Sequence, residues 1–291
     1  MVSSPHRSAA HATVGWHNLA ERLQKTMKFT DQQYLRSEQY KNAENLNARI
    51  QVHQSFSTNK QGLYLWIFDH LKLPENSRIL ELGCGSGTIW VENMSKIADG
   101  WKIILSDLSP GMLEKAEENL REINEQVEYK TIDAQSIPYE DGYFDAVMAN
   151  FMLFHVPNRN QAMAEIHRVL KPGGSLFAAT NGRKHMRELR EMIKEIDKDA
   201  EITSAGELFG LENGGGQLAQ YFSEVELYRY EDSLVITEVE PLVDYVLSSK
   251  RSVLIEENPQ RIADIIKREI ETKGAFRITK DAGMFVATRS V

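Results

Sequence analysis

The central part of the chain alternates between short apolar runs and longer segments with apolar residues at helical spacing. Helical spacing is clearest at 109–123 and 160–170, where apolar side chains recur every three or four residues. Strands that alternate with helices in this way predict a parallel sheet with helices on both faces. The expected strands, each with the length of a buried strand, are 78–82, 102–106, 127–132, 144–149 and 175–180.

The part of the chain before this core is more polar. Residues 1–30 begin with a stretch rich in Ser, Ala and His and free of acidic residues, which we interpret as a flexible leader. Polar helices are expected over 31–60. A clearer apolar helical face follows at 61–72, and Pro74 ends that helix.

The part of the chain after the core is less regular. Gly214–Gly216 is interpreted as a flexible turn, and a terminal hairpin over 276–288 is expected to turn at 281–283. The remaining expected elements are a charged amphipathic helix at 184–198, one or two strands at 222–237, and helices near 239–249 and 258–272.

These elements predict one enlarged domain rather than two. Its main body is residues 74–291, which follow the leader and an N-terminal helical lid at 31–73. Inserts at 184–221 and 239–273 are expected to complete the lid. The predicted fold class is α/β, a Rossmann-like three-layer sandwich with helical lid segments.

Composition and charge narrow the function. The 291 residues include 34 Lys and Arg against 42 Asp and Glu, a formal net charge of −8, which disfavours a general nucleic-acid binder. No apolar run approaches the roughly 18 residues that span a bilayer, and we expect a cytoplasmic protein. A single cysteine, Cys84, excludes an internal disulfide framework and a Cys-rich zinc site, and no metal site is expected. The sequence leaves homo-oligomer formation open.

The strongest motif follows the first strand, where glycines alternate in Gly83-Cys-Gly-Ser-Gly87. Glycines let the backbone approach a ligand, and the next helix adds free N–H groups and a positive dipole end. Such a turn can also serve packing alone. A dinucleotide fingerprint needs glycine where Thr88 stands, so a nicotinamide-dependent oxidoreductase is the minority interpretation.

Two carboxylates are expected at the same edge of the sheet. Asp107 ends the second strand, where a carboxylate suits the two hydroxyls of a ribose, and Leu108 and Met112 beside it can sandwich an adenine. Asp133 and Ala134 follow the third strand, where the carboxylate can accept from an exocyclic amine. Each aspartate can instead be an ordinary cap or turn residue.

Four stretches in this order resemble the successive motifs of class I S-adenosylmethionine-dependent methyltransferases, the broad group that includes quinone-biosynthesis methyltransferases. They are Glu81–Gly87, Asp107–Leu113, Phe144–Val147 and Leu170–Gly174. The resemblance covers about 75–180 and implies a seven-stranded, mostly parallel sheet whose last strand is antiparallel. It implies contacts with S-adenosylmethionine from Glu81, Gly83, Cys84, Gly85, Gly87, Asp107, Leu108, Met112, Asp133, Ala134, Asn150 and Phe151.

The acceptor is expected beyond the fourth and fifth strands. His155 and His185 follow these strands, and each is interpreted either as a catalytic base or as a hydrogen-bonded loop residue. Residues 152–154 either line an apolar acceptor pocket or belong to the core. Asn150–Leu153 lacks the Pro-Pro-aromatic tetrapeptide typical of methyltransferases that act on base or glutamine amide nitrogens, so DNA is not expected as a partner.

The polar helices can also contribute to the site. Tyr34, Tyr40 and Phe56 either pack over the sulfonium by cation–π contact or anchor a helix. Arg49 and residues 57–59 can reach the carboxylate of the cofactor. His53 and His70 are interpreted as structural residues. The leading hypothesis is methyl transfer from S-adenosylmethionine to a small-molecule acceptor. The alternatives are a non-catalytic module that binds this cofactor and, with less support, the oxidoreductase.

Overall fold

A seven-stranded sheet forms the centre of the protein. The computed structural model describes residues 30–39, 44–198, 204–248 and 258–291. The strand order is β3-β2-β1-β4-β5-β7-β6, and β7 runs antiparallel to both of its neighbours. This confirms the α/β class and the single antiparallel strand. The strands are β1 Arg78–Leu82, β2 Lys102–Ser106, β3 Val127–Lys130, β4 Phe144–Met148, β5 Leu170–Asn181, β6 Glu224–Ile236 and β7 Phe276–Thr288.

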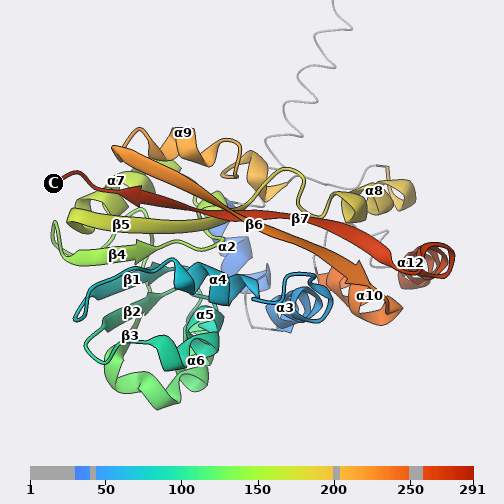
Figure 1. The fold of residues 1–291 in the computed structure, drawn as a ribbon, viewed down its shortest axis with the longest axis horizontal. Helices are drawn as coiled ribbons and strands as arrows, with labels where there is room; N and C mark the ends of the chain where they lie inside the picture. Colours follow the sequence, from blue (N-terminus) through green and yellow to red (C-terminus); the bar gives the residue numbers. More distant parts are fainter. Residues whose placement is uncertain (1–29, 40–43, 199–203, 249–257) are drawn as a thin grey trace, which may run out of the picture.

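Helices cover both faces of the sheet. In Figure 1, α7 and α9 lie on one side of it, and α4, α5 and α6 lie on the other. In the part of the chain that the structure describes, no helix is both long enough and apolar enough to cross a membrane. The helices are α2 Gln32–Tyr34, α3 Glu44–Phe56, α4 Leu63–Asp69, α5 Thr88–Glu92, α6 Pro110–Asn119, α7 Arg159–Val169, α8 Arg187–Ile196, α9 Gly214–Leu218, α10 Val239–Ser248 and α12 Pro259–Lys273.

The regular core follows its local sequence signals closely. Strands β1 and β2 have the predicted bounds. Helix α6 begins after Ser109, whose Oγ accepts from the backbone N of Met112 at 3.3 Å, with Pro110 in the first turn. This arrangement satisfies one free N–H at the helix start, and proline costs nothing where no N–H partner exists. The α6 boundary is therefore decided locally.

The predicted terminal hairpin is wrong, because 276–288 is one uninterrupted strand. Asp281-Ala-Gly283 resembles a turn in sequence, but all three residues pair with β6, and Ala282 and Gly283 pair with β5 as well. A Cβ on Gly283 would lie 2.4 Å from the carbonyl oxygen of Tyr228. The glycine therefore permits two strands to approach closely rather than letting the chain reverse.

The predicted turn at Gly214–Gly216 is also wrong, because these glycines begin helix α9. A Cβ on Gly214 would lie 2.7 Å from the ring of Phe285 in β7. The glycine lets the helix sit directly on the sheet, and that tertiary contact outweighs the low helix propensity of glycine.

The helix after the glycine-rich turn is short. Helix α5 ends at Glu92 and a short 3-10 turn, Met94–Lys96, follows it. Between them the buried side chain of Asn93 donates to the carbonyl oxygens of Ile89 and Tyr64. The amide holds this bend against α4.

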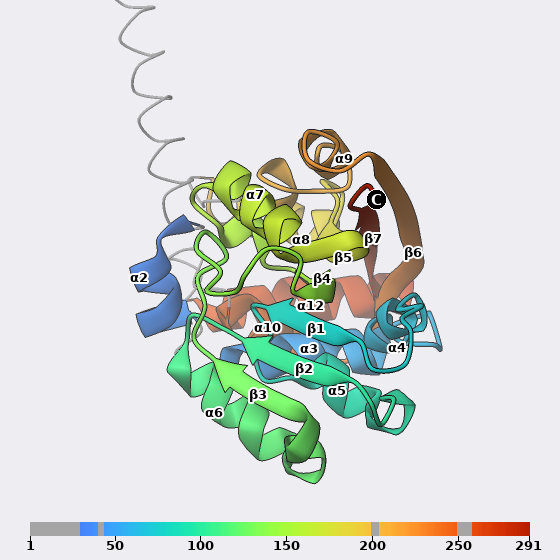
Figure 2. The same cartoon turned by 90° about the vertical axis from the view of Figure 1, so that its left-hand side faces the viewer.

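A second apolar cluster lies beyond the regular sheet. Strand β5 pairs with β7 only over 282–288, so the rest of the β6–β7 ribbon extends past it. Helices α3, α8, α10 and α12 gather around this extension, which Figure 1 shows at the end of the molecule away from β1–β5. We call these four helices and the extended ribbon the helical cluster. Figure 2 shows α3, α10 and α12 beyond the strands of the main sheet. The division of the chain into leader, lid and core stays a prediction, and residues 1–29 lie outside the described ranges.

Candidate active site

A cavity of about 660 Å³ opens at the carboxyl ends of the parallel strands, a volume typical of sites for small ligands. Its wall consists of the segments that follow β1 to β5, residues of α2, and residues of the helical cluster, which includes α3. Of the predicted site residues, Gly87 alone is missing from the wall. Those that line it are Glu81, Gly83, Cys84, Gly85, Asp107, Leu108, Met112, Asp133, Ala134, Asn150, Phe151, His155 and His185.

Two glycines of the turn after β1 have different roles. Gly83 has φ +67°, and a Cβ there would lie 2.8 Å from Cβ of Met152, so the turn passes close to the segment after β4. Gly87 has φ +73° and begins α5, where a Cβ would meet Leu120 at 2.9 Å. Gly83 therefore shapes the cavity wall, whereas Gly87 allows α5 to pack near α6.

Asp107 joins the two loops of the expected nucleoside site. Its Oδ2 accepts from the backbone N of Gly85 at 3.0 Å, and its Oδ1 accepts from the backbone N of Ser109 at 2.8 Å. Burial raises the pKa of the Asp107 carboxyl, and these backbone hydrogen bonds oppose the rise. A carboxylate accepts about four hydrogen bonds, so Asp107 keeps capacity for ligand hydroxyls.

Asp133 meets a side chain that the sequence pattern did not indicate. Its Oδ2 accepts from Nε2 of Gln32 in α2 at 3.2 Å, and Gln135 donates to both of its oxygens. The N-terminal segment therefore reaches the edge of the cavity where an adenine is expected. A lone glutamine 101 positions away carries no signal in one sequence, so only the fold places it here.

Glu81 is buried beneath the cavity, with 2% of its surface exposed. Trp90 Nε1 donates to Oε2 at 2.5 Å, and Asn150 Nδ2 donates to Oε1 at 3.2 Å. Burial raises the pKa of Glu81 to about 7, with a smaller contribution from Asp107, although both hydrogen bonds favour the charged form. Glu81 thus exchanges its proton near neutral pH.

The raised pKa of Glu81 makes stability depend on pH. Below about pH 4.5 the group is protonated in both states; between about 4.5 and 7 only the folded state holds the proton. The free energy of unfolding therefore loses this contribution as the pH rises toward 7. In Glu81→Gln we expect the free energy of unfolding to lack this decrease between about pH 4.5 and pH 7. Denaturant unfolding at pH 5 and pH 8 measures it, with exposed Glu118→Gln as control. An identical pH dependence in Glu81→Gln and the wild type would contradict the assignment.

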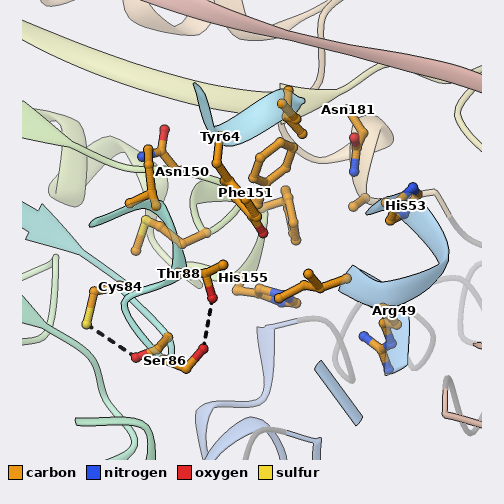
Figure 3. Close-up of a pocket in the computed structure, with 18 of the residues that line it drawn as sticks. Arg49, His53, Tyr64, Cys84, Ser86, Thr88, Asn150, Phe151, His155 and Asn181 are labelled. Carbon is orange, nitrogen blue, oxygen red and sulfur yellow. Dashed lines mark hydrogen bonds between the residues drawn. The ribbon is translucent and has the colours of Figure 1, made fainter. Parts of the chain in front are cut away.

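The segment after β4 turns sharply into the cavity. Phe151 has φ +55°, and its backbone N donates to the carbonyl oxygen of Ala179 at 2.8 Å. Phe151, Met152 and Phe154 line the cavity, whereas Leu153 is 1% exposed and belongs to the core. Leu153 therefore fits the core interpretation, whereas a role of Met152 and Phe154 in an acceptor pocket stays a prediction. Figure 3 shows Phe151 and Tyr64 among the side chains that line the cavity.

The two candidate catalytic histidines both face the cavity but differ in surroundings. His155 packs edge-on against Phe154, with ring centroids 4.5 Å apart. His185 Nδ1 accepts from the backbone N of Asp281 at 3.3 Å. Neutral His185 therefore carries its proton on Nε2 and presents a donor rather than a base from that nitrogen.

His53 was interpreted as structural, but it lines the cavity. Its ring stacks on His185 at 5.9 Å and meets Tyr245 edge-on at 5.8 Å. Its Nδ1 is buried without a hydrogen-bond partner in the described residues. Burial, with the charge of Lys280, lowers the pKa of His53 to about 3. The helical spacing of α3 could not reveal this, because the groups that surround His53 come from the segment after β5, from β7 and from α10.

A buried ion pair in the helical cluster was also not predicted. Lys280 Nζ lies 2.5 Å from Oδ2 of Asp232, and both side chains are almost fully buried. Asp232 also accepts from Ser57 Oγ at 2.7 Å and from the backbone N of Thr58 and Asn59, each at 3.0 Å. Residues 57–59 therefore hold the carboxylate of Asp232. This role differs from the contact with the cofactor carboxylate that the sequence left open for them.

The aromatic side chains of the N-terminal segment lie in two different places. Tyr34 lines the cavity, whereas Phe56 packs into the helical cluster. Tyr40 lies outside the described residues. Tyr64 was not predicted as a site residue; it lines the cavity, and burial raises its pKa.

Known proteins share this fold and its motifs. Residues 80–178 match the family model described as a methyltransferase domain. Over 116 residues the chain is 31% identical to the ubiquinone/menaquinone biosynthesis C-methyltransferase UbiE of Pectobacterium carotovorum. This alignment covers 39% of the present chain and 46% of UbiE. Over 120 residues the chain is 35% identical to the sterol 4-C-methyltransferase strm-1 of Caenorhabditis elegans. This alignment covers 40% of the present chain and 35% of strm-1. The matches thus span less than half of these relatives.

A solved structure extends the likeness in fold. Phosphoethanolamine N-methyltransferase 2 of Haemonchus contortus, in complex with S-adenosyl-L-methionine, aligns with a TM-score of 0.57 at 18% identity. The alignment covers 90% of this chain and 60% of that one. The family match and the similarity to these relatives show a methyltransferase domain in the matched part of the chain. In this chain the family match spans residues 80–178, from β1 into β5.

Proposed function

We propose that the protein binds S-adenosylmethionine in the cavity and transfers its methyl group to a small-molecule acceptor. The observation that carries this proposal is the joint placement of Asp107, the glycine turn and Asp133 on one wall of a single cavity. Asp107 would hold the ribose, Leu108 and Met112 would border the adenine, and Asp133 would meet its amino edge. The other predicted cofactor contacts except Gly87, including Cys84 and Ala134, line the same cavity.

The charge of this wall supports a cationic cofactor. Glu81, Asp107 and Asp133, on β1 or after β2 and β3, line the cavity together with Glu92 at the end of α5. A sulfonium and an ammonium group are both favoured near carboxylates in a site of low dielectric. The bound cofactor supplies an electrophilic methyl group. The protein aligns the acceptor with it and excludes water.

Acceptor activation is proposed to involve His155 or His185. A hydroxyl or carbon acid needs a base within hydrogen-bond reach, and His155 faces the cavity directly after β4. His185, with Nδ1 held by the backbone, is better suited to orient an acceptor oxygen by donation from Nε2. His155 is therefore the stronger proposal for the base.

Activity is tested by transfer of tritium from methyl-labelled S-adenosylmethionine to a panel of small alcohols, phenols, amines, thiols and carboxylic acids. Calorimetry with S-adenosylhomocysteine tests the cofactor site separately. Binding of S-adenosylhomocysteine without transfer to any member, or to small molecules of a cell extract, would favour a non-catalytic binding module. Absence of binding would contradict both interpretations, and hydride transfer with a bound nicotinamide would revive the oxidoreductase.

We expect His155→Ala to lower turnover by about 10²-fold or more, the usual contribution of a positioned base, with an acceptor found in that screen. Affinity for S-adenosylhomocysteine should change less than about threefold, because His155 would serve the acceptor. The control is His70→Ala, since His70 contacts Trp66 and Tyr228 and does not line the cavity. Full turnover in both His155→Ala and His185→Ala would exclude a histidine base.

A further inference from the structure

The ionisable side chains of the cavity are divided by charge. Three of its four carboxylates, Glu81, Asp107 and Asp133, lie on β1 or follow β2 and β3, whereas Glu92 ends α5 and accepts from Nε2 of Gln54 in α3. The basic side chains come from the N-terminal segment, the segment after β5 and strand β7. They are Arg36, Arg49, Lys60, Arg190 and Lys280. Arg36 and Lys60 are exposed, so the partly buried cations of the second half are the other three.

In the part of the chain that the structure describes, two of these three cations have no acidic partner. Lys280 is neutralised by Asp232. Arg49 donates to Oγ and the backbone carbonyl of Ser248, and Arg190 donates to the backbone carbonyls of His185 and Arg183. Within the described ranges, no carboxylate lies at ion-pair distance from either guanidinium. The carbonyl oxygens accept some of the hydrogen bonds that each guanidinium can donate. They carry no full negative charge, so they do not neutralise the positive charge of the arginine.

The acidic residues nearest to Arg190 have other contacts or face solvent. Glu188 accepts from both the backbone N and Oγ1 of Thr279 and pairs with Arg187. Glu191 lies 3.8 Å from Arg187, and Glu207 is exposed. None of these three carboxylates lies at ion-pair distance from Arg190, and their charges raise its pKa by less than burial lowers it.

The two arginines are linked by a pair of histidines. Arg190 donates to the carbonyl of His185, whose ring stacks on His53, and Arg49 lies one helical turn before His53 on α3. Figure 3 shows Arg49 and His53 on this helix, bordering the cavity. The buried Nδ1 of His53 has no partner in the described residues. Buried polar atoms are rarely left unpaired, so this nitrogen points to a ligand group that the structure does not contain.

We propose that the methyl acceptor carries an anionic group, a carboxylate or a phosphate monoester, which Arg190 binds with His53 and Arg49 beside it. This inference rests on the proposed function and names its substrate class. The proposed function places the nucleoside at the ends of β1 to β3, which leaves the part of the cavity beyond β4 and β5 for the acceptor. An apolar body fits the wall between the two halves, which includes Phe151, Met152, Phe154, Met186 and Ala205.

The cofactor also carries a carboxylate, so the test must separate the two anions. Octanoate and octyl phosphate are titrated by calorimetry into protein saturated with S-adenosylhomocysteine, with octanamide and octylamine as neutral and cationic probes. The same titrations are made with Arg190→Met, Arg190→Lys and Arg187→Met. Arg187 is the matched control, because it lies on the same helix, is exposed and does not line the cavity.

We expect at least one of the anions to bind wild type about tenfold more tightly than octanamide, a difference of about 1.4 kcal/mol. Arg190→Met should reduce this preference to less than about twofold, Arg190→Lys should keep part of it, and Arg187→Met should not change it. Octanoate and octyl phosphate distinguish a carboxylate from a phosphate site. Affinity for S-adenosylhomocysteine should stay within about threefold in all variants.

Three results would overturn the inference. They are equal or weaker binding of both anions relative to octanamide, an unchanged preference in Arg190→Met, and a loss of S-adenosylhomocysteine affinity in Arg190→Met without loss of anion binding. The last would assign the guanidinium to the cofactor. Failure of S-adenosylhomocysteine to bind wild type would instead contradict the proposed function. The probes titrated without it would then still report the anion preference.

Discussion

Replacing Asp107 by alanine is expected to weaken S-adenosylhomocysteine binding by about 10- to 150-fold. Hydrogen bonds to a charged group contribute about 1.5–3 kcal/mol, and the ribose would lose its carboxylate partner. The substitution also releases the backbone N–H groups of Gly85 and Ser109, which Asp107 holds at 3.0 and 2.8 Å. The turn after β1 would then lose part of its order, which adds to the loss of affinity. Calorimetry measures the change.

Two further variants separate these contributions. Asp107→Asn keeps an oxygen for one backbone N–H but loses the charge, so an intermediate affinity is expected. Asp141→Ala removes a carboxylate that pairs with Arg168 outside the cavity and should leave affinity unchanged. Wild-type affinity in a folded Asp107→Ala protein would show that the nucleoside does not bind at the end of β2.

Gly83→Ala is expected to have the second large effect, on both stability and cofactor affinity. Alanine at φ +67° costs about 1–2 kcal/mol. The new Cβ would also lie 2.8 Å from Cβ of Met152, an atom that cannot rotate away. Such overpacking typically adds about 1–3 kcal/mol. We expect the free energy of unfolding to fall by about 2–5 kcal/mol, together with a loss of S-adenosylhomocysteine binding.

Gly274→Ala is the matched control for backbone strain. Gly274 has φ +79° at the end of α12, and a Cβ there would meet nothing within 4 Å. It should therefore cost only the conformational part and leave cofactor affinity intact. Equal destabilisation by the two substitutions in denaturant unfolding would show that the contact with Met152 relaxes freely.

The sequence alone determined the regular half of the protein. The bounds of β1 and β2 and the cap of α6 at Ser109 follow from short-range patterns, because a buried strand and a helix start each leave a local signature. The cofactor wall was predictable for the same reason. Asp107 directly follows β2, Asp133 comes shortly after β3, and parallel strands end at one edge of a sheet.

The tertiary structure decided the other half. The glycines at 214 and 283 looked like turn residues, but they serve close contacts with Phe285 and Tyr228 that one sequence does not display. The buried ion pair of Lys280 with Asp232 and the stack of His53 on His185 join residues far apart in the chain. Local patterns specify strands, caps and the loops that follow them. The acceptor half of the cavity depends on which distant segments pack together, which only the complete fold determines.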